Sequence, residues 1–156
     1  MSSIVIAGDT SGIVTLQAPA IAGTTIINLP ANSMNIGNGG GGLSGNTAFG
    51  SSALNANTTG AENVAIGSSA LVLNTIGADN TAVGYRALAA NVTGANNTAI
   101  GAVALRNNTA SNNTAVGIYA LYNNTTGTPN DAFGYQALYS NTTGAYNVAE
   151  IGRAHV

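Results

Sequence analysis

The chain has 156 residues, of which 45% are hydrophobic and only 5% are charged, and its net charge is −2 at pH 7. A typical soluble protein is about 25% charged, but the apolar share here disfavours intrinsic disorder. With three arginines and no lysine, the chain lacks the basic field that attracts nucleic acid or an anionic membrane. No apolar run is long enough to insert into a membrane, and the absence of cysteine excludes disulfides and thiol chemistry.

The first predicted element is a small N-terminal module, residues 1–31. β-prone runs at 4–6, 13–16 and 25–29 alternate with Gly-Asp and Ala-Gly turns, a pattern that predicts a short β-meander. Residues 32–45 contain the stretch "GNGGGGLSG", and we expect them to form a glycine-rich linker or an irregular first coil. This stretch matches the G-x-G-x-x-G dinucleotide pattern in form only, because no βαβ unit surrounds it.

Residues 46–149 repeat one phrase: Asn-Thr-Ala, a bulky apolar residue, Gly, two variable residues and Ala-Leu. The steps between successive glycines are 17, 17, 17, 16 and 17 residues. This period is too short for a helix-turn-helix repeat, which needs about 33 residues or more, and the frequent Gly and Asn oppose helices. It predicts a β-solenoid, with two or three short strands in each coil joined by tight turns. The repeated glycines are Gly50, Gly67, Gly84, Gly101, Gly117 and Gly134.

Stacked coils pair their backbones about 4.8 Å apart, so like residues are expected to lie over like residues. We expect the leucines of the Ala-Leu pairs to form one internal column, and the bulky residues before the glycines to form a second. We expect asparagine side chains to form ladders along the turns. The leucine column comprises Leu54, Leu71, Leu88, Leu105, Leu121 and Leu138. The second column comprises Phe49, Ile66, Val83, Ile100, Val116 and Phe133.

Such a core is thin, because each coil contributes one leucine, one other large apolar residue and small alanines. Full burial of a large side chain contributes about 1.5–3 kcal/mol, so two of them barely offset the entropy lost when a whole coil is ordered. This favours several chains around a common axis. We predict an all-β fold, a β-solenoid (β-roll) of about six coils that assembles as a homo-trimer. A fully enclosed single-chain solenoid is the alternative.

The units "NTAVGYRAL", "NTAIGAVAL" and "AFGYQALYSNTTGAYN" resemble the repeat common in phage tail fibres and large bacterial surface proteins. They are similar, more distantly, to the head repeats of trimeric autotransporter adhesins, whose Val-Ala-Ile-Gly core matches residues 64–67. The N-terminal stretch resembles a short module of phage structural and tail proteins. The resemblance covers residues 46–149 and implies a trimeric β-solenoid shaft that displays or forms a receptor-binding surface.

The final residues, 150–156, break the repeat, because Glu150 stands where a bulky apolar residue is due. Back-translated, residues 151–156 can be spelled as a widely used sequencing adapter. We therefore expect this segment to be a non-native, adapter-like tail, and the gene to be a metagenomic fragment cut within a read. Long-read sequencing that finds the same stop codon in its native context would refute this hypothesis.

Few residues offer enzymatic or metal chemistry. His155 is the only histidine, and it lies in the adapter-like tail without a candidate partner. Glu62 and Asp79 occupy equivalent repeat positions one coil apart, which allows a paired-carboxylate or Ca²⁺ role. A solvated turn is the better interpretation, because Asn96 and Tyr146 occupy the same position elsewhere. We expect no enzymatic activity, no cofactor and no metal site.

The candidate surface contacts are aromatic and basic residues near the coil corners: Tyr85, Arg86, Tyr119, Tyr122, Tyr135 and Tyr139. Exposed tyrosine among Asn and Thr suits stacking on sugars or on receptor loops. The alternative is that these rings cap the apolar columns or pack between chains. Arg106, the other cation of the repeats, could contact anionic glycans, or it could be solvated surface.

The function we expect is that of a structural fibre segment in a phage tail or similar appendage. It would attach to a host-surface glycan or protein receptor through many weak contacts whose avidity adds up. The expected location is the virion, or the extracellular space and cell surface. A bacterial trimeric surface adhesin is one alternative, which the neighbouring genes would distinguish. An ice-binding solenoid is another, although the threonines read as turn residues more than as a flat Thr-x-Thr strand.

Overall fold

The computed structural model describes residues 15–16, 27–28 and 45–150. In the N-terminal part, β1 (Thr15–Leu16) and β2 (Ile27–Asn28) pair antiparallel, with Thr15 opposite Asn28. The rest of the predicted module at 1–31, and the predicted linker at 32–45 apart from Gly45, lie outside the described residues.

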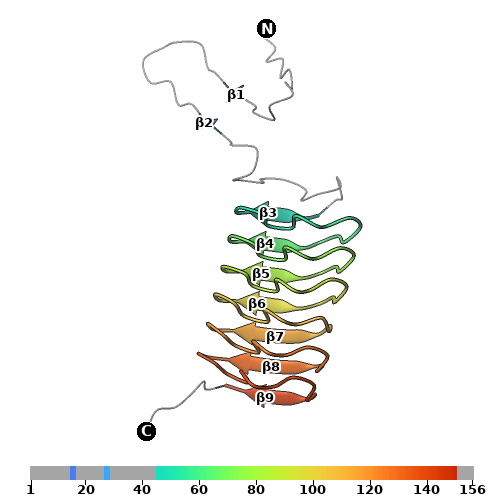
Figure 1. Ribbon diagram of the computed structural model, residues 1–156, viewed down its shortest axis with the longest axis vertical. Helices are drawn as coiled ribbons and strands as arrows, with labels where there is room; N and C mark the ends of the chain where they lie inside the picture. Colours follow the sequence, from blue (N-terminus) through green and yellow to red (C-terminus); the bar gives the residue numbers. More distant parts are fainter. Residues whose placement is uncertain (1–14, 17–26, 29–44, 151–156) are drawn as a thin grey trace.

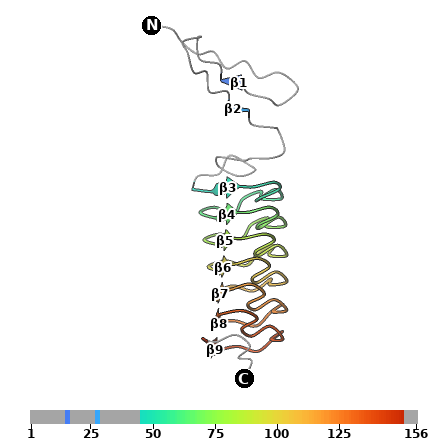
Figure 2. The same ribbon diagram turned by 90° about the vertical axis from the view of Figure 1, so that its left-hand side faces the viewer.

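The repeats form a seven-stranded parallel sheet in which each strand pairs with the next one in sequence (Figures 1 and 2). Equivalent repeat positions are partners throughout: Ala65 pairs with Ala82, and Ala82 with Ala99. The fold is therefore an all-β parallel β-solenoid of about six coils, as the period predicted. The strands are β3 (Thr47–Phe49), β4 (Val64–Ile66), β5 (Thr81–Val83), β6 (Thr98–Ile100), β7 (Asn113–Val116), β8 (Asn130–Phe133) and β9 (Asn147–Ala149).

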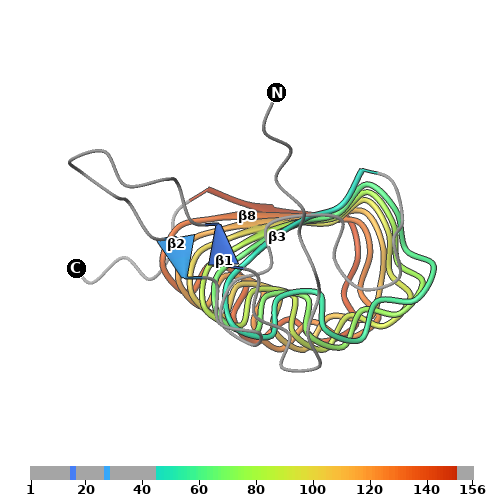
Figure 3. The ribbon, with the colours of Figure 1, turned by 90° about the horizontal axis from the view of Figure 1, so that it is seen from above.

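Each coil contains one strand, not the two or three expected, and the remainder of the coil is made of turns. We call the six residues after the strand glycine the Ala-Leu loop (85–90 in the β5 coil), and the segment that leads to the next strand the Asn-Gly turn (91–97). Figure 3 looks along the stack and shows the coils nearly superimposed, with the strands along one side. The loops also bond from coil to coil: the Leu88 N–H donates to the Ala104 carbonyl at 3.0 Å, and the Ala90 N–H to the Arg106 carbonyl at 2.9 Å. A turn can thus replace a strand, because its backbone groups find partners in the adjacent coil.

The apolar part of the interior consists of leucine and alanine. Leu54, Leu71, Leu88, Leu105 and Leu121 are fully buried, and Leu138 in the last coil is partly buried. In β3 to β8 the inward-facing strand residue is an alanine that is also inaccessible to solvent, as Ala82 and Ala99 show. Because strand side chains alternate, the residues on either side of that alanine must point outward.

The expected second internal column is therefore wrong. Its members lie on the outer face of the sheet, where Phe49 is 49% exposed, Ile100 42% and Phe133 40%. The physical reason is the narrow interior: one leucine, two alanines and the asparagines described next already fill each layer, so the strand can turn only a methyl group inward. We call this set the outer apolar column; it comprises Phe49, Ile66, Val83, Ile100, Val116 and Phe133.

Two ladders of buried asparagine side chains complete the interior. In the first ladder, the Asn80 Nδ2 donates to Asn63 Oδ1 at 3.0 Å, and the Asn97 Nδ2 donates to Asn80 Oδ1 at 3.1 Å. In the second, the Asn91 Nδ2 donates to Asn74 Oδ1 at 2.9 Å. The first ladder runs through Asn46, Asn63, Asn80, Asn97, Asn113, Asn130 and Asn147, and the second through Asn57, Asn74, Asn91, Asn108, Asn124 and Asn141.

The ladders meet at the glycine carbonyl in four of the Asn-Gly turns, at Gly60, Gly77, Gly94 and Gly144. The Gly94 carbonyl accepts from Asn80 Nδ2 and from Asn91 Nδ2, both at 2.9 Å. The buried amides therefore depend in part on the neighbouring coils, since the Asn80 side chain bonds to Asn63 in the preceding coil and to Asn97 in the following coil. Asparagine ladders along the turns were predicted from the sequence. In the structure these side chains are also buried, and their bonds to the turn carbonyls attach the turns to the core.

The single 16-residue step is a one-residue deletion in an Asn-Gly turn. Here Ala110 takes the place of the glycine, and its carbonyl accepts from Asn97 Nδ2 at 2.9 Å and from Asn108 Nδ2 at 2.7 Å. Unlike Asn74 and Asn91, Asn108 does not also donate to the asparagine of the preceding coil, so Asn91 Oδ1 is buried without a hydrogen-bond partner. The second ladder is therefore interrupted between Asn91 and Asn108.

The tight loops require left-handed backbone at residues other than glycine. Every leucine of the buried column has a φ between 49° and 51°, a region that costs an L-residue about 1–2 kcal/mol. Gly84, which ends β5, has a φ of 138°, and a Cβ there would lie 2.5 Å from the Gly101 carbonyl oxygen. The repeated Gly is thus required by both the backbone angle and the closeness of the next coil.

Val103 offers a test of this strain, because it is a half-buried β-branched residue with a φ of 55°. Asparagine tolerates this region far better than valine, so Val103→Asn is expected to raise the free energy of unfolding by about 1 kcal/mol. Urea unfolding followed by circular dichroism measures the change. Val92→Asn is the matched control: Val92 is 39% exposed and is not among the residues with a positive φ. An equal effect of both substitutions would contradict the explanation.

Candidate binding surface

The Ala-Leu loops place side chains of changing character along one face of the stack. Serine occupies the two positions after the glycine in the first loops, at Ser51, Ser52, Ser68 and Ser69. The β5 coil carries Tyr85 and Arg86 there, and the β7 and β8 coils also carry large residues, including Tyr119 and Tyr135. Since the coils stack in register about 4.8 Å apart, side chains at equivalent positions lie next to one another.

Four of the predicted tyrosine contacts come together as one cluster, which we call the tyrosine cluster: Tyr119, Tyr122, Tyr135 and Tyr139. The Tyr122 and Tyr139 rings occupy the same loop position in adjacent coils and stack with centroids 5.3 Å apart and planes 8° apart. Tyr119 lies against both, at 5.4 Å from Tyr122 and 6.1 Å from Tyr139. Tyr135 meets Tyr119 edge-on at 6.4 Å. Such pairs each contribute about 0.5–1.5 kcal/mol beyond burial.

Arg106 extends this stack by one coil. Its guanidinium carbon lies 5.8 Å from the centroid of the Tyr122 ring, within the range of a cation–π interaction. Tyr122 therefore has Arg106 on the side of the preceding coil and Tyr139 on the side of the following coil. It presents an edge and a hydroxyl to solvent, not a free face for stacking on a sugar. Tyr135, which is 54% exposed, has the most accessible ring of the cluster.

Tyr85 and Arg86 form a separate pair in the β5 coil, with the Arg86 guanidinium carbon 5.3 Å from the Tyr85 ring centroid. Tyr85 is 51% exposed. The structure thus divides the predicted contacts into two groups, one around Arg86 and one around Arg106.

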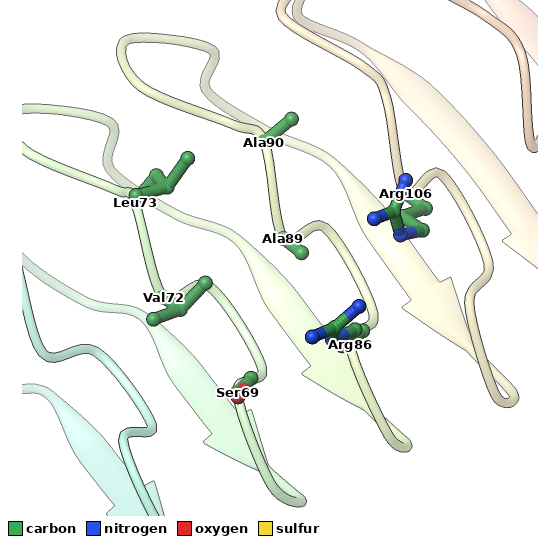
Figure 4. A pocket seen from close by; sticks show the side chains of 7 residues that line it. All are labelled: Ser69, Val72, Leu73, Arg86, Ala89, Ala90 and Arg106. Carbon is green, nitrogen blue, oxygen red and sulfur yellow. The ribbon is translucent and has the colours of Figure 1, made fainter.

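An open hollow of about 310 Å³ lies between these two groups (Figure 4). Arg86, Arg106 and Ser69 contribute its polar groups, and Val72, Leu73, Ala89 and Ala90 its apolar lining. Leu73, 52% exposed, was missed by sequence reasoning. The sequence did contain a sign of it, because Leu73 is a large apolar residue at a loop position that alanine occupies in the adjacent coils, at Ala56 and Ala90.

Across residues 45–150, neither Arg86 nor Arg106 forms an ion pair with a carboxylate. Arg106 Nη1 donates to Asn107 Oδ1 at 3.0 Å and lies 3.5 Å from the Tyr122 hydroxyl. The remaining donors of both guanidiniums are available, since each carries five N–H groups. The hollow is therefore a site of uncompensated positive charge.

The carboxylates Glu62 and Asp79 lie elsewhere, in the Asn-Gly turns. Both are exposed, with left-handed φ values of 57° and 58°, and the Asp79 N–H donates to the Ala61 carbonyl at 3.1 Å. In the parts of the chain that the structure describes, no three His, Cys, Asp or Glu side chains gather where they could hold a metal ion. His155 and the G-x-G-x-x-G match at 37–42 lie outside those parts.

The Asn-x-Thr sequences of the turns are explained by the ladders. Asn57 is 5% exposed, and its Nδ2 donates to the Gly60 carbonyl at 2.8 Å. Glycosylation of this nitrogen would require the side chain to leave the core. The threonine hydroxyls of these turns also bond between coils, as Thr75 Oγ1 does to the Val92 carbonyl at 3.0 Å.

Comparison of the chain with protein-family models, with curated proteins and with solved structures gave no match. The parallel β-solenoid with its period near 17 residues is established by the strand register alone. No helix in the described residues is long and apolar enough to span a membrane.

Proposed function

We propose that this chain is a segment of a fibre, of the phage tail-fibre type, that attaches to a host surface through many weak contacts. The observation that carries the proposal is the register of the stack: each coil adds one more copy of the same corner positions along a rigid axis. Repetition of weak sites along and around a shaft raises avidity through effective concentration. The role is structural and adhesive, not enzymatic, and the proposed location is the virion or another extracellular surface.

We propose further that three copies associate through the outer apolar column. This column exposes large apolar side chains from β3 to β8 on one face of the sheet, and continuous patches of this kind favour protein–protein contact. Around a threefold axis parallel to the stack, each coil would meet its equivalents from two other chains at the same level.

The association has a direct test. Sedimentation equilibrium is expected to give a mass three times the 15.3 kDa of the chain. Ile66→Ser with Ile100→Ser should weaken the assembly by at least about tenfold, because each isoleucine loses part of about 1.5–3 kcal/mol of burial. The double control Ile76→Ser with Ile118→Ser removes two isoleucines that are 55% and 48% exposed but lie off this column. A monomer at every concentration, or equal effects of both pairs, would contradict the proposed interface.

The outer face of the sheet also favours a second candidate, an ice-binding solenoid. Thr81, Thr98 and Thr114 pair in register and point outward, so these threonines belong to strands and not to turns. Val64 and Asp131 interrupt the column, which weakens this candidate. Thermal hysteresis measured on the full chain tests it: measurable hysteresis that Thr98→Tyr abolishes would support ice binding, and its absence would remove the candidate.

A further inference from the structure

The hollow between Arg86 and Arg106 combines two features that a single ligand could satisfy. Arg86 and Arg106 belong to adjacent coils and line the same hollow (Figure 4). Among the described residues no carboxylate pairs with either guanidinium. Two guanidiniums without a counter-charge at one open site are complementary to an anion, and guanidinium matches a planar carboxylate with two parallel hydrogen bonds.

The lining between the arginines is apolar. Val72, Leu73, Ala89 and Ala90 present aliphatic carbon to the hollow, and Leu73 is 52% exposed. A bare phosphate or other small inorganic anion would gain nothing from this surface. A sugar ring has C–H groups that pack on aliphatic side chains, and it carries hydroxyls that the Ser69 side chain could bond.

From these features we propose that the hollow binds an acidic sugar residue, a uronic acid within a host-surface polysaccharide. The carboxylate lies between Arg86 and Arg106, and the sugar ring covers the aliphatic lining. The volume of about 310 Å³ is at the low end for small-molecule sites, so one sugar residue occupies it. The inference rests on the proposed attachment function and names the class of receptor.

The tyrosines have a positioning role in this site. Tyr122 holds the Arg106 guanidinium by its ring face and by its hydroxyl, 3.5 Å from Nη1, and Tyr85 lies under Arg86. Holding both guanidiniums in place before the ligand arrives lowers the entropy lost on binding. The rings act through the arginines, which explains why Tyr122 needs no free face.

Isothermal titration of the full chain with a galacturonic acid tetramer tests the inference. We expect a Kd on the order of 1 mM, since the site is small and open. The double variant Arg86→Gln with Arg106→Gln should weaken binding by at least about 100-fold, tenfold for each lost charge-assisted pair. The double variant Arg86→Lys with Arg106→Lys should bind more tightly than the glutamine pair and more weakly than the original chain. Lysine keeps the positive charge but lacks the planar guanidinium that donates two parallel hydrogen bonds to a carboxylate.

The matched control is Thr142→Asp with Thr143→Asp. It changes the net charge by the same two units as the glutamine pair but on exposed residues of the last turn, so affinity should change by less than about twofold. Tyr122→Ala should weaken binding without abolishing it, and added salt should not remove this difference. No binding of the tetramer, undiminished binding by the glutamine pair, or displacement of the tetramer by equimolar inorganic phosphate would overturn the inference.

The two proposals can fail separately. Binding to neutral glycans or to host cells, with no affinity for the galacturonic acid tetramer, would overturn the acidic-sugar site and leave attachment standing. Failure of the assembled chain to bind any glycan array or host-cell preparation would overturn the proposed attachment function itself.

Discussion

Replacing Leu88 by aspartate is expected to unfold the central coils. Leu88 is completely buried between the equivalent leucines of the adjacent coils, so the new carboxylate has neither water nor a partner. Burying an unpaired charge costs several kcal/mol, a large part of the 5–15 kcal/mol that stabilises a typical domain. Because each coil contacts only the adjacent coils, a charge at this position destabilises the packing against both the preceding and the following coil.

Thermal unfolding measured by circular dichroism should show a midpoint lower by more than about 10 °C for a domain of this size. Light scattering should show loss of the assembled species. The matched control is Leu73→Asp, because Leu73 is 52% exposed and its carboxylate would remain in water. An unchanged midpoint for Leu88→Asp, or equal losses for both variants, would rule out a buried leucine column.

The second large effect is expected from Asn80→Leu. The Asn80 side chain makes four hydrogen bonds in the core: its Nδ2 donates to Asn63 Oδ1 and to the Gly94 carbonyl, and its Oδ1 accepts from the backbone and side-chain N–H groups of Asn97. Leucine removes all four and leaves the Asn97 N–H buried without an acceptor. Each such group costs about 1–3 kcal/mol, so we expect a loss of about 3–5 kcal/mol.

Guanidinium unfolding provides the measurement for this variant. Asn55→Leu is the control, since Asn55 is exposed in an Ala-Leu loop, and its replacement should change the free energy of unfolding by no more than about 0.5 kcal/mol. If the Asn80→Leu variant were as stable as the original protein, the asparagine ladders would stabilise the fold by filling space and not by hydrogen bonding.

The coil architecture could be predicted because the fixed spacing of the repeat shows which residues of successive coils are aligned. Gly84 recurs as Gly101, and Leu88 as Leu105, at a fixed spacing, and parallel stacking is the arrangement that brings such residues together. The face that turns inward could not be predicted from alternation. Val83 is bulkier than Ala82 and was assigned to the core, but the width of the interior is set by the opposite wall, where Leu88 already fills the layer.

The candidate site was predictable in its residues but not in its geometry. Tyrosine and arginine at loop positions could be identified from the repeat. That Tyr122 stacks between Arg106 and Tyr139 depends on all three occupying one loop position in successive coils. The hollow depends on small side chains at Ala89 and Ala90 beside Leu73. A hollow that results from small side chains leaves no recognisable motif in the sequence.

The missing residue near Ala110 has a consequence for how the rod comes apart. The side-chain ladder through Asn91 stops there, and a buried oxygen is left unsatisfied, so the two halves are joined less firmly than the coils within each half. Cooperative opening of a repeat array begins at its weakest junction. Amide hydrogen exchange should therefore show two blocks of protected residues, one on each side of this junction. A fibre under mechanical tension should unfold first at the same junction.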